Sequence, residues 1–418
     1  DRKKAVNEGY FEELIRKYLL ENPHGCIMTL VPKKGLAAQR EKELEEKLEA
    51  YRSSLSEEQL DAMVEKTKAL EAYQEAGEDP KALECIPMLK RSDIKREAAK
   101  IINEELTVDD SLFLYHDVCT NGIGYVDLMF KTDSIAPEQI PYLGLLKSVL
   151  GYVDTENYTY GELFNEINAN TGGINCGVEV FDRADSTEEF QAMFSVRGKA
   201  LYTKMDFLFK MIGEILNSSK LEDTKRLYEI VASVKSRAQV NLTGAGHSTA
   251  VLRATAYSSP MAAFQDEMAG IGYYQFIEKL EKDFEQRKEE TVEELCKLMK
   301  KILRPENFMI SYTGERESME TVQKLAGAVK AGLGTEPVEK SKEKLTCTKK
   351  NEGFKTSGQV QYVAQTGNFK KKGLEYTGAL EILKVILSYD YLWMNLRVKG
   401  GAYAVSYTHL TLPTICSV

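Results

Sequence analysis

The sequence predicts an α+β fold, in which a mostly antiparallel sheet carries helices on one face and is preceded by a long helical hairpin. Between residues 91 and 340, strand-like and amphipathic segments follow in the order strand pair, helices, strand pair, helices. A doubly wound parallel sheet would instead alternate single strands with single helices. Upstream, residues 35–77 hold two charged amphipathic segments joined by a helix-start signal, which predicts the hairpin.

The overall composition limits the classes of protein and partner. With 418 residues, of which 43% are hydrophobic, the chain is long enough for about three domains with buried cores. The net charge of −9 and the pI near 5.4 argue against a nucleic-acid partner, which needs a basic surface. An acidic surface suits an enzyme that takes basic peptides, although many ordinary cytosolic proteins are equally acidic.

The seven cysteines show no Cys-x-x-Cys spacing, a pattern typical of free thiols in a reducing compartment. The sequence has no signal peptide and no apolar run long enough to span a bilayer, so we expect no membrane contact. These observations favour a cytoplasmic, bacterial protein. Because the chain starts inside a helix-like segment without a methionine, we expect that further residues precede it.

Residues 1–34 have the features of the end of a domain. Apolar side chains at helical spacing predict a helix from residue 9, which Asn22-Pro23 ends. Residues 26–31 then predict a strand. Because one helix and one strand cannot close a core, we interpret 1–34 as the C-terminal end of a preceding domain.

Residues 35–90 form the predicted hairpin region. Two apolar stripes at helical spacing, within 36–55 and 60–70, predict two antiparallel helices. Ser56 and Gln59 match a capping box that starts the second helix. The short helices favour a linker or hinge between larger pieces, and a coiled-coil interaction module is the alternative.

Residues 91–340 predict one α+β domain. Strands over 112–118 and 124–131 are expected to pair around the turn Asn121-Gly122, because Asn-Gly is a strong hairpin signal. A second strand pair is expected over 174–181 and 190–196. The remaining elements are helices over 136–152, 160–168, 202–216, 223–239 and on through 301, a strand over 308–312 and a helix over 317–329.

Residues 341–403 predict a polar linker and the truncated start of a further domain, with a strand over 359–365 and a helix over 374–392. Residues 404–418 have no amphipathic period. Their run SYTHLTLPT matches the translation of a transposon-derived sequencing adapter, so we interpret 404–418 as a non-native tail. Leu410, Leu412 and Ile415 would then carry no structural meaning.

Arg397 and Tyr403 are the candidate functional residues, and they flank Gly400-Gly401 in the run YLWMNLRVKGGAY. Arginine supplies a fixed fork of donors and tyrosine one hydroxyl, so the pair can grip a peptide carbonyl or an oxyanion. The two glycines let the backbone approach a substrate closely. The simpler interpretation is an ordinary helix C-terminus, with a basic residue in the last turn followed by a glycine cap.

The other polar motifs favour structural roles. The four histidines are His24, His116, His247 and His409, and no two lie within five residues, so no helix presents two imidazoles to one metal. His116 and its neighbour Asp117 point to opposite faces of a strand. The Thr243–His247 run, TGAGH, predicts a helix break, and Cys119 and Cys176 predict free thiols.

Several stretches resemble the presequence-protease branch of the insulinase-like zinc metallopeptidases, also called pitrilysin or peptidase M16. They are FEELIRKYLLENPH, the hairpin, NYTYGELFNEINANTGGI, GAGHSTAVLRA and YLWMNLRVKGGAY. The resemblance implies that 1–34 ends the second domain, 91–340 is the third insulinase-like domain and 341–403 begins the fourth. It also implies zinc as cofactor, bound by a His-x-x-Glu-His motif that this chain lacks.

The resemblance implies a clamshell enzyme that cuts short unfolded peptides with zinc-activated water. This chain would supply a chamber wall and the catalytic, substrate-binding pair Arg397 and Tyr403, with Gly400 and Gly401. Its partner would be the N-terminal catalytic half of the same polypeptide, and the chain alone would be inactive and hold no zinc. The alternative is a non-catalytic insulinase-like subunit that acts by binding.

Overall fold

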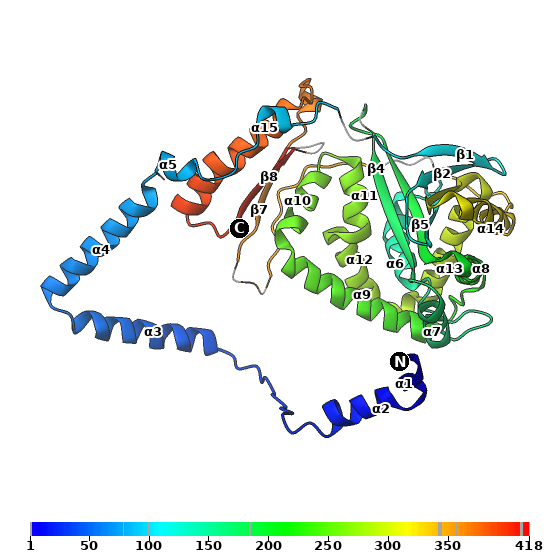
Figure 1. The fold of residues 1–418 in the computed structure, drawn as a ribbon, viewed down its shortest axis with the longest axis horizontal. Coiled ribbons are helices and arrows are strands. Elements are labelled where there is room, and N and C mark those ends of the chain that lie inside the picture. The colour runs from blue at the N-terminus through cyan, green and yellow to red at the C-terminus, as the bar shows by residue number, and fades with distance from the viewer. Residues whose placement is uncertain are drawn as a thin grey trace. The chain divides into compact units, whose positions relative to one another are not determined.

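The computed structural model describes residues 2–77, 79–97, 100–183, 185–341, 345–356, 358, 360–409 and 413–417. The chain divides into two compact units, Asp1–Ala98 and Ala99–Val418 (Figure 1). Among the described residues, no helix is both long and apolar enough to cross a membrane.

The first unit is helical. None of its described residues forms a strand, so the strand predicted for residues 26–31 is wrong. Ile27 and Leu30 of that segment are almost fully exposed. The physical reason is that a strand needs a neighbour to satisfy its backbone groups, and this unit offers none. The elements are α1 (Arg2–Asn7), α2 (Tyr10–Ile15), a π-helical turn (Arg16–Leu20), α3 (Leu36–Ser53), α4 (Glu57–Glu75), α5 (Pro80–Leu83) and a 3₁₀ turn (Arg91–Asp93).

The two predicted hairpin helices are present as α3 and α4. The capping box is also confirmed: Gln59 N donates to Ser56 Oγ at 3.3 Å, and Ser56 N donates to Gln59 Oε1 at 2.9 Å. Neither helix buries a residue, however. The apolar stripes of α3 and α4 do not pack against each other. Each stripe is narrow, so packing the two helices together would bury little apolar surface.

The second unit is built on a six-stranded sheet whose order is β1-β2-β6-β3-β5-β4. Among these strands only the β2–β6 pair is parallel, so the predicted mostly antiparallel sheet is confirmed. The strands are β1 (Glu104–Val108), β2 (Ser111–Asp117), β3 (Ile123–Lys131), β4 (Ile174–Asp182), β5 (Phe190–Leu201) and β6 (Phe308–Gly314).

The predicted pairing of β2 with β3 is wrong, because β6 lies between them. Ile310 of β6 is in register with Phe113 of β2 on one side and with Leu128 of β3 on the other. The Asn121-Gly122 turn itself is present, with φ of 54° and 81°. An Asn-Gly signal predicts only the local turn of the backbone. The same turn can connect two strands that are not adjacent in the sheet and have a third strand between them.

Glu315, directly after β6, fastens this turn to the inserted strand. Its Oε1 accepts hydrogen bonds from Thr120 N at 3.1 Å and Asn121 N at 3.2 Å. Its Oε2 accepts a hydrogen bond from the hydroxyl of Tyr202. These bonds, with that from Tyr202 the strongest influence, lower the pKa of Glu315 to about 2.

One face of the sheet carries the core. Val126, Leu128 and Phe130 of β3 are buried, whereas Tyr125 on the opposite face is exposed. The covering elements are α6 (Ile140–Val149), α7 (Tyr160–Asn170), α8 (Met205–Ser218), α9 (Thr224–Gly244), α10 (Gly246–Ala256), α11 (Pro260–Ala269), α12 (Ile271–Lys282), α13 (Phe284–Ile302), α14 (Met319–Ala331) and short 3₁₀ turns at Pro137–Gln139, Tyr202–Lys204, Pro305–Asn307 and Arg316–Ser318.

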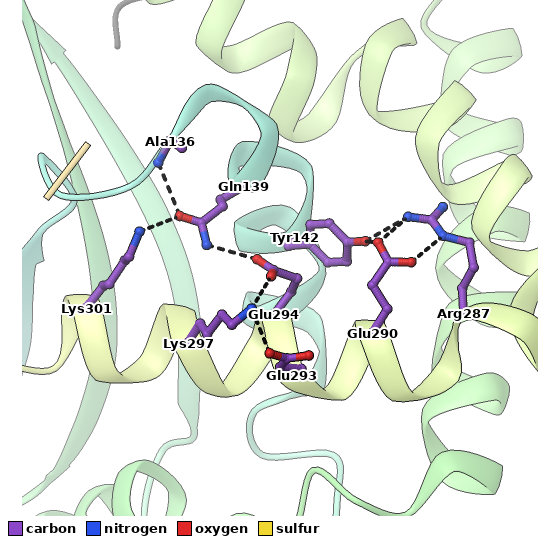
Figure 2. A network of polar contacts seen from close by, with 9 residues as sticks. All are labelled: Ala136, Gln139, Tyr142, Arg287, Glu290, Glu293, Glu294, Lys297 and Lys301. Carbon is purple, nitrogen blue, oxygen red and sulfur yellow. Dashed lines mark hydrogen bonds and ion pairs between the residues drawn. The ribbon is translucent and has the colours of Figure 1, made fainter. Parts of the chain in front are cut away.

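Helix α6 is buried on nearly every side, so the few polar groups at its start need protein partners. Figure 2 shows that α13 supplies them. Gln139 Nε2 donates to Glu294 Oε2 at 2.9 Å, and Tyr142 OH donates to Glu290 Oε1 at 2.9 Å. Burial, reinforced by this bond, raises the pKa of Tyr142 to about 12.

The C-terminal segment contains a short strand, a helical stretch and a small sheet. The predicted strand is confirmed only as β7 (Val363–Thr366), and the predicted helix starts later, as α15 (Ala379–Ile386) followed by a π-helical segment (Leu387–Lys399). A 3₁₀ turn lies at Lys370–Lys372. Within residues 404–418, β8 (Val405–His409) and β9 (Pro413–Ser417) form a sheet with β7. Leu410 and Leu412 lie outside the described residues, and the non-native origin of the tail stays a prediction.

Glu315 provides a test of the inserted strand. Its folded-state pKa of about 2 lies below the ordinary 4.5, so its contribution to stability is present above pH 4.5 and is lost as pH falls toward 2. We expect Glu315→Gln to lower the melting temperature by a few degrees at pH 7, and the difference from wild type to shrink between pH 5 and pH 3. Calorimetry at several pH values measures both.

The matched control is Glu317→Gln, an exposed carboxylate two residues away. It should leave the melting temperature unchanged across the same pH range. Equal effects of the two variants would contradict the role assigned to Glu315.

Candidate functional site

Arg397 lies in the last turn of the π-helical segment, as the simpler interpretation of the motif, a helix C-terminus, expects. The helix ends at Lys399, and Gly401 N donates to Arg397 O at 3.0 Å. Gly401 adopts φ of 72°, a conformation that side chains disfavour. The local geometry is therefore a glycine-capped helix end, which holds Arg397 on regular backbone just before the chain reverses.

The guanidinium of Arg397 stacks on the indole of Trp393, one turn earlier in the helix. Its Cζ lies 4.0 Å from the ring centroid, a cation–π contact that orients the side chain. No carboxylate of the described residues forms an ion pair with Arg397. Its hydrogen-bond donors therefore stay available to a ligand.

Tyr403 is 79% exposed. Within the described part of the chain its hydroxyl has no recorded hydrogen bond, and no contact joins it to Arg397. The structure thus places both candidate residues on either side of Gly400-Gly401 without bringing them together. The chemistry available is donation of hydrogen bonds to an oxygen of a bound molecule, and the clamp itself stays a prediction.

No three His, Cys, Asp or Glu side chains among the described residues are arranged to hold a metal ion. His116 contacts Ile102 O through Nδ1 at 2.7 Å and Ser311 Oγ through Nε2 at 3.2 Å, which confirms its structural role. His247 lies in the first turn of α10, directly after the helix break at Ala245. The described residues therefore do not fit a zinc centre.

The six cysteines whose side chains the structure describes are free thiols, three of them with a raised pKa. Burial raises the pKa of the Cys176 thiol to about 12 and also raises the pKa of Cys296 and Cys347. Cys26, Cys85 and Cys119 are exposed free thiols. A catalytic cysteine needs a lowered pKa, so burial disfavours a nucleophilic role for Cys176, whereas the role of Cys119 stays a prediction.

Sequence reasoning missed a polar hollow of about 360 Å³ on the open face of the sheet. Arg197 of β5 lines this hollow and pairs with Asp127 at 2.7 Å and Glu179 at 3.1 Å. Oδ1 of Asp127 is buried without a partner in the described structure, and burial raises the pKa of this carboxyl despite Arg197. The available signal was the alternation of polar and apolar residues in the middle of each strand, which places Tyr125 and Asp127 of β3 and Arg197 and Lys199 of β5 on one face. Other lining residues are Tyr125, Gly172, Gly173, Asn175, Lys199, Ser311 and Thr313.

A family model matches residues 30–280, more than half of the chain, and it describes a region associated with the peptidases of family M16, subfamily C. The chain belongs to this family. Protein HypA of Clostridium perfringens is 37% identical over 96% of this chain, and the presequence protease 1 of Arabidopsis thaliana is 28% identical over 95% of it. These relatives place the chain in the presequence-protease branch of peptidase M16.

The chain spans well under half the length of these relatives: 41% of the Clostridium protein and 37% of the Arabidopsis protein. A solved structure described as a protease from Helicobacter pylori has the same fold, with a TM-score of 0.50 and 14% identity over 75% of this chain and 74% of that chain. At that identity the likeness supports the α+β fold alone.

Trp393 is the single tryptophan of the chain and reports on Arg397 directly. Because the guanidinium covers one face of the indole, we expect Arg397→Ala to make tryptophan fluorescence more sensitive to quenching by acrylamide. Lys399→Ala, two residues later, should not change it. Equal quenching of wild type and Arg397→Ala would contradict the stacking.

Proposed function

We propose that this chain is the C-terminal half of a zinc metalloendopeptidase that degrades short, unfolded peptides. The observation that carries the proposal is the match of 95–96% of the chain to relatives of more than twice its matched length, one of them named presequence protease. The zinc ligands would then lie in the N-terminal half of the same polypeptide. When bound there, zinc supplies the activated water.

The open face of the sheet would form part of a chamber wall. Helices cover the other face, so this one is left to contact a peptide. The hollow offers hydroxyl and amide groups of Tyr125, Asn175 and Thr313 beside the Arg197–Asp127 pair. These groups can donate hydrogen bonds to peptide carbonyls and accept hydrogen bonds from peptide N–H groups, so they can bind a peptide backbone whatever the side chains of the peptide.

Arg397 and Tyr403 would form the substrate clamp. The Tyr403 hydroxyl would donate to the scissile carbonyl oxygen as that oxygen gains negative charge, and Arg397 would anchor the neighbouring backbone. A preorganised donor at a developing oxyanion contributes about 10²–10³ in turnover. The Gly400-Gly401 turn supports this arrangement because it ends the helix and leaves Tyr403 exposed.

We also infer that the protein works in the cytoplasm of a bacterium. The more identical of the two relatives described above comes from Clostridium perfringens, and the six cysteines whose side chains the structure describes are free thiols. Fractionation of the native host, followed by immunoblotting, tests the location.

A chimera tests the proposed activity. Residues 1–403 of this chain would replace the matching segment of the Clostridium relative. We expect the chimera to bind zinc stoichiometrically and to cut a short unfolded peptide, with a chelator abolishing cleavage. The 418-residue chain alone should bind no stoichiometric zinc and cut nothing. A folded chimera that binds peptide without cutting it would instead favour a non-catalytic binding subunit.

Within an active chimera, Tyr403→Phe tests the clamp. Loss of the hydroxyl should lower kcat at least about tenfold, because the missing donor acts on the transition state. Tyr389→Phe is the matched control, since Tyr389 lies in the same segment and is also exposed. Unchanged turnover of Tyr403→Phe would remove this residue from the mechanism.

A further inference from the structure

Arg253 of α10 joins three parts of the second unit, although its side chain is only 12% exposed. Its Nη1 lies 2.5 Å from Asp266 Oδ2 at the end of α11, and its Nε lies 2.6 Å from Glu352 Oε1. Glu352 belongs to the segment that follows the sheet domain, 99 residues further along the chain. One guanidinium fork therefore ties this segment to two helices.

Asp266 makes the helix side of this contact rigid. Its side chain is 2% exposed and accepts hydrogen bonds from Ile271 N at 3.0 Å and Gly272 N at 3.2 Å. These are the first backbone amides of α12, so the carboxylate caps that helix independently of Arg253. Because Asp266 is fixed, it fixes the direction in which Arg253 presents its remaining donors.

The linker side is held by Arg253 and its neighbours. Tyr257 OH donates to Glu352 Oε1 at 2.5 Å, and the Arg253 guanidinium lies 5.8 Å from the Phe354 ring. The hydrogen bond from Arg253, followed by that from Tyr257, lowers the pKa of Glu352. Isolated buried ion pairs add little net stability, which favours a role in fixing geometry.

Two further contacts continue this attachment toward the candidate site. A Cβ at Gly246 would overlap the ring of Tyr362, so the glycine at the start of α10 allows the residue before β7 to pack closely. Lys371 Nζ contacts Glu188 at 2.6 Å and Ser258 O at 2.9 Å, eight residues before α15 begins. The stretch GAGHSTAVLRA thus contains both Gly246 and Arg253, the residues of α10 that contact Tyr362 and Glu352.

We propose that Arg253 is a positioning residue, which clamps residues 345–356 onto α10 and α11 and so sets the place of the segment that carries Arg397 and Tyr403. This inference rests on the proposed peptidase function. In the proposed peptidase, Arg253 does not contact the substrate. Arg253 affects turnover only by attaching the linker to the helices. This attachment requires a forked guanidinium, because one side chain must bind the carboxylates of Asp266 and Glu352 at the same time.

Hydrogen exchange and kinetics on the same variants test the proposal. Glu352→Ala removes the linker contact and leaves the Arg253–Asp266 pair and the cap of α12 intact. We expect exchange within residues 345–372 to become about tenfold faster, the scale of one lost charge-assisted hydrogen bond, with residues 271–282 unchanged. In the active chimera, kcat should fall about tenfold with little change in KM.

Arg253→Lys keeps the charge but not the fork, so it should resemble Glu352→Ala. Glu339→Ala is the matched control, because Glu339 is an exposed carboxylate just before the linker. Unchanged exchange in Glu352→Ala would overturn the clamp. Faster exchange with unchanged kcat would overturn the positioning role. If the unmodified chimera were inactive, the proposed function and the positioning role would both fail, whereas exchange in the chain would still decide whether Arg253 holds the linker.

Discussion

The second unit depends on the insertion of β6 between β2 and β3. This strand joins the two halves of the sheet, since it is parallel to one neighbour and antiparallel to the other. Its alternating buried side chains complete the core face, and Glu315 at its end fastens the turn between the strands that it separates. Because β6 fills the space between β2 and β3, the sheet is continuous, and Ser311 and Thr313 of β6 line the polar hollow on its open face.

The attachment of the C-terminal segment obeys a different constraint. Among the described residues of this segment, Glu352, Tyr362 and Lys371 contact α10 and the turn that follows it through separate polar and close-packed contacts. Charged contacts of this kind are directional, so they specify position more than they add stability. Arg397 and Tyr403 lie beyond this attachment, on a capped helix end and the turn that follows it. Their placement is therefore set by residues distant from them in sequence.

The sequence predicted the elements better than their partners. Hydrophobic periodicity identified five of the six strands of the sheet, all but β1, and most helices, and the capping box at Ser56 was correct in both of its hydrogen bonds. The predicted pairing of β2 with β3 is wrong because the strand that lies between them, β6, comes from residues near 310. No signal in the sequence around β2 and β3 indicates a strand so far along the chain. The strand predicted for residues 26–31 is wrong because a segment with strand propensity forms a strand only beside a second strand, and the described residues of the first unit contain none. Arg397 and the glycine turn were recognisable from the motif, whereas the hollow around Arg197 needs strands from three parts of the chain, and Arg253 meets Glu352 only after folding.

The inserted strand also sets the order in which the chain can fold. His116 of β2 and Ser311 of β6 are 195 residues apart, yet they lie side by side in the sheet. During synthesis from the N-terminus, β2 and β3 emerge long before the strand that must separate them, and they carry a turn that favours their direct association. Closing so long a loop makes folding slow, because its entropy is lost before the contacts form. A hairpin of β2 with β3 is therefore a competing, non-native pairing that the domain must avoid or reverse before the six-stranded sheet can form.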